Sequence, residues 1–128
     1  MHYQLTITKN QMAVTIRALD LFSRMLMRQY DALVLNEDIG LPLCQLNALR
    51  KQTEQLGAIF GFGRGASYCI MSPEIPDSAR VAYDIQQVAR HLLAWERHPE
   101  GGHTVDFHEP HKTSHGVEGL PQAVIIKE

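Results

Sequence analysis

The chain has 128 residues, of which 45% are hydrophobic and 20% charged, and its formal net charge is -2. This size predicts a single domain over residues 1–128 with room for a core, and the composition is that of an ordinary globular protein. A charge so close to neutral argues against a dedicated binder of nucleic-acid polymers, which normally carries a strongly basic face.

Neither a targeting segment nor a membrane span is visible in the sequence. The start, MHYQLTITKNQ, lacks the basic region and the apolar run of a signal peptide, and no window reaches the roughly 18 apolar residues of a membrane span. Cys44 and Cys69 form no CxxC pair, so free thiols in a reducing compartment are the simpler interpretation and a disulfide is the alternative. We therefore expect a soluble, cytoplasmic protein with no membrane partner.

The first elements expected are a short strand and a long helix. Residues His2–Thr8 alternate between apolar and polar side chains, which is typical of a strand with one buried face. From Lys9 to Val34 the chain contains neither Gly nor Pro, and Thr8 or Asn10 can cap the first turn. We predict one helix over this range.

This helix carries two apolar stripes instead of one. The first stripe consists of Met12, Ile16, Leu19, Leu26, Tyr30 and Leu33. The second consists of Val14, Ala18, Leu21, Phe22 and Met25. An apolar arc of this width indicates a helix that is central in its domain or packed against another subunit. Because the chain offers few other helices to cover it, we expect a homo-oligomer.

The middle of the chain predicts a second, shorter helix and a glycine-rich loop. Gly40 and Pro42 break the chain before this helix, which runs from about Pro42 to Leu56 and has Gly57 as its stop signal. The loop that follows, GAIFGFGRGASYCIMSPEIP, has irregularly spaced glycines, and Ser67–Met71 within it is a candidate strand.

A third helix begins near Asp77 or Ser78, either of which can cap its first turn. Its apolar face consists of Val81, Ile85, Val88, Leu92 and Trp95. Pro99 and the glycines behind it end the helix. Thr104–Phe107 then alternates with the period of a strand.

From these elements we predict an α+β fold in which three helices, two long and one shorter, pack with a small antiparallel sheet. The sheet consists of His2–Thr8 and Thr104–Phe107, with Ser67–Met71 as a further candidate strand. The tail from about residue 111 is expected to be flexible. Its apolar end, Ala123–Ile126, is expected to dock as a strand or against a partner.

Five histidines lie between residues 98 and 115, and they raise the question of a metal site. Asp106, His108 and His111 are carboxylate and imidazole groups that could converge on an ion such as zinc. Pro110 lies between the two histidines and excludes the helical spacing of an HExxH motif. A polar role in surface loops is the favoured interpretation, and no metal ligands are assigned.

Two stretches could bind an anionic ligand. In GFGRG, backbone N–H groups and Arg64 could cradle a phosphate, although the segment matches no known phosphate-binding motif and a mobile loop is the alternative. On the third helix, Arg90 and Arg97 lie seven residues apart near Tyr83 and Trp95. They could hold a planar, phosphorylated ligand by stacking and charge, or they could simply complement the helix C-terminus.

No nucleophile motif accompanies these residues, because no serine lies in a GxSxG context and Cys69 has no evident histidine partner. We assign no catalytic residue and no cofactor. The sequence leans away from an enzyme without excluding one.

Three phrases carry a resemblance, namely TIRALDLFSR, PDSARVAYDIQQVARHLLAW and ERHPEGGHTVDFHEP. Over about residues 6–110 the chain resembles a group of small, mostly uncharacterised proteins of tailed phages and prophages. The resemblance implies a compact accessory protein of the host bacterial cytoplasm. Several phage proteins of this size are homo-oligomers that bind nucleotide immune signals and silence host defence, and this is an analogy independent of fold.

The leading hypothesis is a non-catalytic phage-type protein that binds and sequesters a nucleotide-derived immune signal, either a cyclic ADP-ribose variant or a cyclic dinucleotide. The ligand-binding residues predicted for it are Phe62, Arg64, Tyr83, Arg90, Trp95 and Arg97, completed by a second subunit. One alternative is a protein-interaction module that inhibits or modulates a host protein through an apolar helix face. The other is a metal-dependent hydrolase that uses the His-rich segment.

Overall fold

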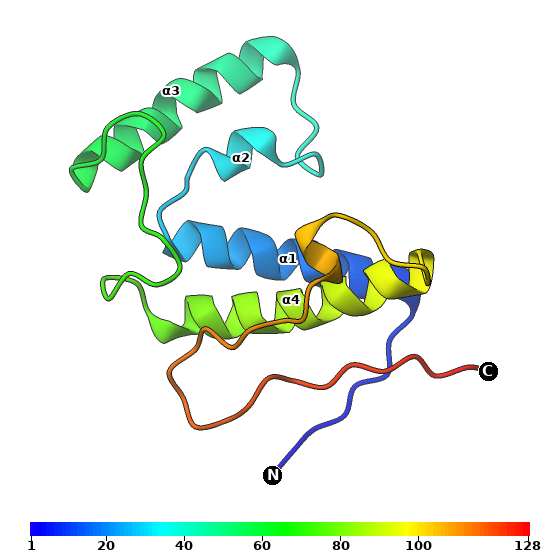
Figure 1. Cartoon of the computed structure of the whole chain (residues 1–128). Coiled ribbons are helices and arrows are strands. Elements are labelled where there is room, and N and C mark those ends of the chain that lie inside the picture. Colours follow the sequence, from blue (N-terminus) through cyan, green and yellow to red (C-terminus); the bar gives the residue numbers. More distant parts are fainter.

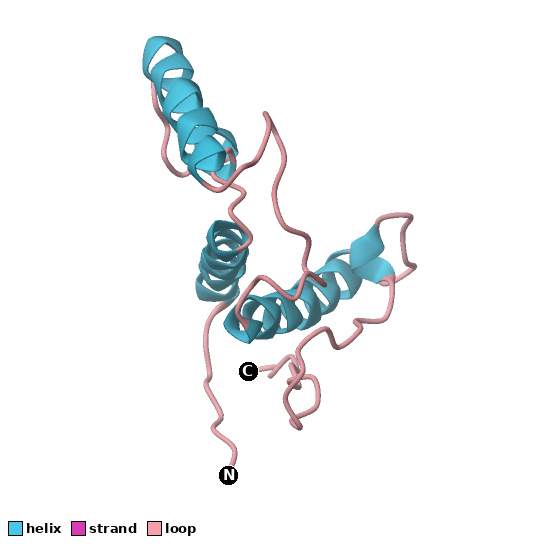
Figure 2. Cartoon of the chain, turned by 90° about the vertical axis from the view of Figure 1, so that its left-hand side faces the viewer, coloured by secondary structure: helices cyan, strands magenta, loops and turns pink.

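The computed structural model describes residues 1–128 and is entirely helical and irregular, with no strand in the chain (Figures 1 and 2). Three long helices are present, α1 (Lys9–Leu26), α3 (Leu43–Ile59) and α4 (Asp77–Arg97). A single turn, α2 (Ala32–Leu35), and a 3₁₀ turn, η1 (Val105–Phe107), complete the set. The α+β expectation is therefore wrong, because every segment expected to form the sheet lacks a strand partner.

The expected strands fail for three different reasons. His2–Thr8 precedes α1 as an extended arm with no strand beside it, and Ala123–Ile126 is likewise unpaired. Ser67–Met71 is a loop held by two contacts, because the Tyr68 N–H donates to the Met27 carbonyl at 3.0 Å and the Ile70 carbonyl accepts from Arg80 at 2.8 Å. Thr104–Phe107 closes on itself, because the Phe107 N–H donates to the Thr104 carbonyl and makes the turn η1.

Helix α1 begins where the sequence predicts and ends earlier. Thr8 is its cap: the Thr8 hydroxyl accepts from the Gln11 N–H at 3.2 Å, and the Gln11 side chain accepts from the Thr8 N–H at 2.9 Å. This reciprocal pair is a capping box. The helix stops at Leu26 instead of reaching Val34, because Arg28 takes a left-handed conformation with φ of 64°. Its guanidinium then lies 3.6 Å from the centre of the Phe60 ring.

Helix α4 starts at Asp77, but neither Asp77 nor Ser78 caps it. Pro76 occupies the cap position, with no side-chain hydrogen bond. Proline fixes the backbone angle before the first turn, and Asp77 is thereby free to accept from the His115 N–H instead.

The core lies mainly between α1 and α4. Ser23 of α1 is buried and donates its hydroxyl proton to the Ala79 carbonyl of α4 at 3.1 Å. Met27, Ile75 and Ala79 form the buried apolar cluster at one end of this pair. Figures 1 and 2 show α3 and α2 standing apart from it, and α3 packs against no helix except α2.

The chain buries little of itself. Only twelve residues are buried, and the accessible surface is 9275 Å². A compact monomer of 14.5 kDa exposes about 6900 Å² by the usual scaling of surface with mass. The chain thus exposes about 2400 Å² more than a compact monomer would, by the same scaling. Cys44 and Cys69 are unpaired and exposed, and no helix combines the length and apolarity needed to cross a membrane.

Candidate functional site

The structure divides the six predicted ligand-binding residues between two regions. Phe62 and Arg64 lie in the loop after α3, whereas the other four lie on α4. Figure 1 shows this loop beside α3, at the opposite side of the molecule from the C-terminal half of α4. Within one chain the six residues do not line a common pocket.

The glycine-rich loop is occupied by its own contacts. Arg64 Nε lies 3.1 Å from Glu54 Oε1 in an ion pair, with the arginine side chain 80% exposed. Phe62 packs edge-on against Tyr68, with ring centres 4.9 Å apart. The cavity beside the loop measures about 30 Å³, which is room for one or two waters and not for a nucleotide.

A larger cavity lies between α4 and the segment after η1. Its volume is about 170 Å³, and its lining includes Tyr83 and Arg90 from the predicted set together with Asp106, His108 and His111. The sequence predicted these two groups of residues for two different functions, and the structure brings them to one place.

The lining of this cavity carries one cation, Arg90, and two carboxylates, Asp106 and Glu109. Arg90 Nε lies 3.5 Å from Asp106 Oδ1, an ion-pair contact that lacks hydrogen-bond geometry, so this buried N–H makes no hydrogen bond. Exposed His108 and His111 lie at the rim. No three His, Cys, Asp or Glu side chains anywhere in the chain are placed to hold one metal ion. The geometry gives the metal-hydrolase alternative no support.

Trp95 and Arg97 lie near the end of α4 but outside this cavity. The Trp95 indole N–H donates to the Phe107 carbonyl at 3.2 Å, and the two rings meet edge to face with centres 5.5 Å apart. Trp95 therefore holds η1 against α4. Arg97 is the last residue of α4 and is exposed.

The most extensive polar arrangement was not predicted from the sequence. One side of α4 binds the returning chain, residues 106–115, which we call the strap. The residues of α4 that hold it are Asp77, Asp84, Gln87, His91 and Trp95. They recur at spacings of seven, three, four and four, so they share one helical face. The strap runs antiparallel to α4, because its early residues meet the end of the helix.

Most contacts with the strap end on main-chain groups. The Gln87 side chain donates to the His111 carbonyl at 2.9 Å and accepts from the His111 N–H at 3.3 Å. His91 Nδ1 lies 2.9 Å from the Asp106 carbonyl. Since a carbonyl only accepts, this contact requires the proton on Nδ1. In this way the backbone N–H and C=O groups of an extended segment find hydrogen-bond partners although the segment is not part of a sheet.

Asp84 of α4 is the side chain that accepts the most hydrogen bonds from the strap. The carboxylate is buried and accepts from the hydroxyl and N–H of Thr113, at 2.7 and 2.8 Å, and from those of Ser114, at 2.6 and 3.1 Å. Burial raises the pKa of Asp84, but these hydrogen bonds outweigh it and hold the pKa below its ordinary value.

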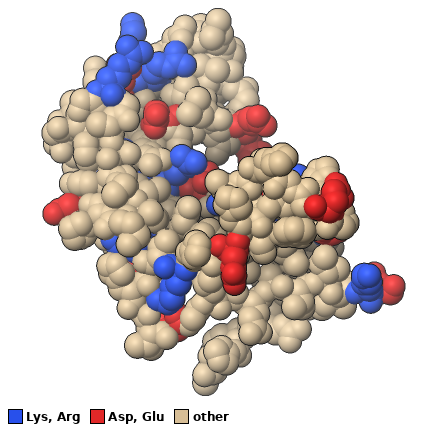
Figure 3. All heavy atoms as spheres, in the orientation of Figure 1, with Lys and Arg blue, Asp and Glu red and all other residues tan.

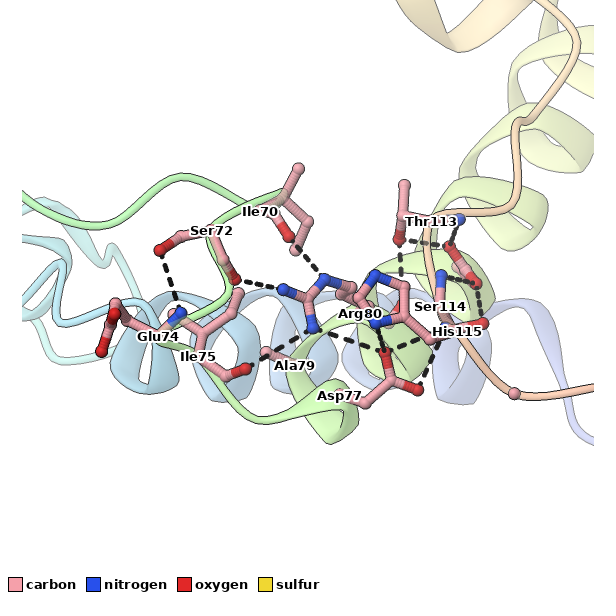
Figure 4. Close-up of polar contacts among 12 residues, drawn as sticks. Ile70, Ser72, Glu74, Ile75, Asp77, Ala79, Arg80, Thr113, Ser114 and His115 are labelled. Atoms are coloured by element: carbon pink, nitrogen blue, oxygen red, sulfur yellow. Dashed lines mark hydrogen bonds and ion pairs between the residues drawn. The ribbon is translucent and has the colours of Figure 1, made fainter.

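Arg80 lies between Asp77 and Asp84 on α4 and is the largest fully buried side chain of the molecule. Its guanidinium donates to the Ile70 carbonyl at 2.8 Å, to the Ile75 carbonyl at 3.5 Å and to the Ser72 carbonyl. Figure 4 shows these carbonyls gathered on one side of Arg80 and Asp77 on the other. Asp77 Oδ1 lies 3.4 Å from Arg80 Nη1.

Asp77 therefore joins the loop before α4 to the strap. It accepts from the His115 N–H at 3.0 and 3.2 Å while facing Arg80. The His115 N–H is the chief reason that the pKa of Asp77 lies below its ordinary value, with a smaller contribution from Arg80. The arrangement is structural in character, since each polar group is paired within the chain.

Comparison with known proteins gives no further guide to the function, because no protein-family model, no curated protein and no solved structure matches the chain.

Proposed function

We propose that the protein is a non-catalytic interaction module that binds another protein through the uncovered apolar surface of α2 and α3. The observation that carries the proposal is that α3, a helix of 17 residues, has no buried apolar residue. Thr53 is the only buried residue of this helix.

Large apolar side chains of this region are exposed instead. Leu35 is 75% exposed, and Leu43 and Ile59, at the two ends of α3, are each 73% exposed. Burying one such side chain stabilises a complex by about 2 kcal/mol. An isolated helix of this length is marginal in water, and α2 is a single turn, so α3 lacks the cover that helices of this kind normally have.

The surface over α3 has both a basic and an uncharged part. Figure 3 shows Lys and Arg side chains gathered at the upper left of the visible face, where α3 lies in Figure 1, with broad uncharged surface beside them. Exposed apolar surface with polar residues around it is typical of protein-binding sites. A partner that presents an amphipathic helix or an apolar groove would fit it. A host bacterial protein is the partner class that the resemblance to phage proteins implies.

The test is co-purification from a bacterial extract, with the bound proteins quantified and identified by mass spectrometry. We expect one bacterial protein to be retained stoichiometrically by the wild-type chain and lost with Leu43→Glu. Leu43 is so exposed that a carboxylate there costs the fold little. Ala48→Glu, at an exposed position of α3 about 140° around the helix from Leu43, is the matched control and should retain the protein. Equal retention by all variants, or by none, contradicts the proposal.

A second candidate function is the binding of a nucleotide-derived signal, and the cavity beside Arg90 supports it. Tyr83 lines the cavity with a ring that could stack on a base, and Arg90 has a buried N–H that makes no hydrogen bond. Aromatic stacking and a cationic donor are the two kinds of contact in the nucleotide hypothesis. The volume of about 170 Å³ is below the roughly 300 Å³ of the smallest usual ligand pockets, so such a ligand would project from it and need a second wall. Calorimetry with cyclic ADP-ribose variants and cyclic dinucleotides tests this candidate. Micromolar binding that is lost in Arg90→Ala supports it, and no heat with any of them rejects it.

A further inference from the structure

The outer face of α1 is a second uncovered apolar surface, distinct from the one on α3. Val14, Ala18 and Phe22 follow each other at intervals of four residues and form a stripe along the helix. Val14 and Phe22 are each 49% exposed, and Ala18 is exposed. Each position turns the helix by about 100°, so Ala18 lies about 140° around the helix from Ser23, which faces α4.

No element of the chain covers this stripe. Figure 2 shows α1 nearly end-on, with α4 and the loop before it on one side, α2 and α3 above, and nothing on the remaining side. The stripe therefore faces solvent along about two turns of a helix whose opposite face forms the core.

The order of side chains along the stripe is self-complementary. A small residue, Ala18, lies at its centre, with Val14 one turn before and Phe22 one turn after. If two copies of α1 cross antiparallel at Ala18, the Phe22 of each copy meets the Val14 of the other. The small residue lets the two backbones approach. A twofold pair requires one patch to match itself in this manner.

The paired surface has to extend beyond the stripe. A standard interface takes about 800 Å² from each partner, which is more than three side chains can supply when the two largest, Val14 and Phe22, are each 49% exposed. The N-terminal arm can add to it, because the arm begins where the end of the partner's α1 would lie in an antiparallel pair. Tyr3 and Leu5 on the arm are 90% and 80% exposed.

We propose that the occupant of this stripe is a second copy of the chain, paired antiparallel through Val14, Ala18 and Phe22 about a twofold axis at Ala18. This inference concerns a different surface from the one proposed on α3.

Analytical ultracentrifugation of the wild-type chain over roughly 1–100 μM, the affinity range of weak to moderate interfaces, tests the pairing. We expect the mass to rise to twice the 14.5 kDa of one chain. Ala18→Glu brings two carboxylates together at the axis, so we expect the monomer with unchanged helical circular dichroism. Ala48→Glu makes the same substitution at an exposed alanine of α3, and we expect it to pair like the wild type.

A covalent readout covers the case in which Ala18→Glu fails to fold. In a Cys44→Ser and Cys69→Ser background, Ala18→Cys should form a disulfide-linked dimer on mild oxidation, because residues at a twofold axis approach within the Cα separation that a disulfide needs. Ala48→Cys in the same background should not. A wild-type chain that stays monomeric at the highest concentration overturns the inference, and so does a dimer that Ala18→Glu leaves intact.

Discussion

Asp84 and Ser114 are 30 positions apart in the chain and are joined by two hydrogen bonds, 2.6 Å from the hydroxyl and 3.1 Å from the backbone N–H. With the matching pair from Thr113, one buried carboxylate holds the strap near its C-terminal end. The strap is thus attached to α4 chiefly by polar contacts, and its stability depends on a few identified side chains.

Replacing Asp84 should release the strap. Asp84→Ala removes four hydrogen bonds to an ionised, buried acceptor, and we expect a loss of about 3 kcal/mol in the free energy of unfolding. Denaturant unfolding measures the loss, and hydrogen exchange should show the Thr113 and Ser114 amides deprotected. Glu96→Ala removes a surface ion pair with Lys9, 3.6 Å long, and should cost less than about 1 kcal/mol. Equal losses in the two variants would contradict a special role for Asp84.

Acid should loosen the same contacts. The pKa values of Asp77 and Asp84 are lower in the folded chain than in the unfolded one. Their stabilisation is therefore complete above the ordinary carboxyl pKa of about 4 and is lost as the pH falls through the lowered folded values. We expect the free energy of unfolding to decline below about pH 4, more steeply in the wild type than in a chain with Asp84→Asn. Parallel pH profiles for the two proteins would be inconsistent with this account.

Arg80 should tolerate no neutral replacement. Arg80→Met leaves the carbonyls of Ile70, Ser72 and Ile75 without their donor and Asp77 without its cation. Breaking a buried charged network in this way costs about 3–5 kcal/mol. Thermal unfolding followed by circular dichroism gives the loss. Arg24→Met, which breaks exposed contacts with Asp20 and Gln29, each 2.9 Å long, should shift the midpoint little, and a shift as large as that of Arg80→Met would refute the argument.

Gly102 should accept no side chain. A Cβ atom there would lie 2.4 Å from the Phe107 ring, so Gly102→Ala must displace the ring that packs against Trp95. Overpacking of this kind costs about 1–3 kcal/mol. Trp95 is the only tryptophan, so its fluorescence reports the change directly, and we expect a shift to longer wavelength. Gly63→Ala, where a Cβ would meet nothing within 4 Å, should leave the spectrum unchanged.

Local sequence signals predicted where the helices begin better than where they end. Thr8, one of the two predicted caps, is the cap of α1, and Pro99 and Gly101 mark the end of α4, but α3 continues through its predicted stop, Gly57, to Ile59. The end of α1 was missed because it depends on Arg28, whose unusual backbone is compensated by stacking on Phe60, far along the chain.

The sheet failed because period-two alternation shows only that a segment can pair, and pairing needs a partner. His2–Thr8 has none within the chain. In the second expected strand Phe107 instead turns onto Trp95, which an alternation pattern cannot reveal.

For the candidate site, sequence reasoning named individual residues and did not predict their grouping. Tyr83 and Arg90 share a cavity with Asp106, whereas Phe62 and Arg64 lie elsewhere. The polar face of α4 offered one signal that could have been used, since Asp77, Asp84 and Gln87 recur at helical spacing. Flexibility of the tail from about residue 111 stays a prediction, although residues 111–115 are hydrogen-bonded to α4.

The contact between the strap and α4 constrains the sequence of α4 more than the sequence of the strap. Gln87 and His91 bind carbonyl and amide groups that every residue possesses, whereas each of these helix side chains has a specific shape and proton arrangement. Many strap sequences would therefore satisfy the same helix, provided that small hydroxyl residues face Asp84. Few sequences of α4 would provide the hydrogen bonds that hold the strap. We therefore expect substitutions on α4 to weaken the attachment far more often than substitutions in the strap.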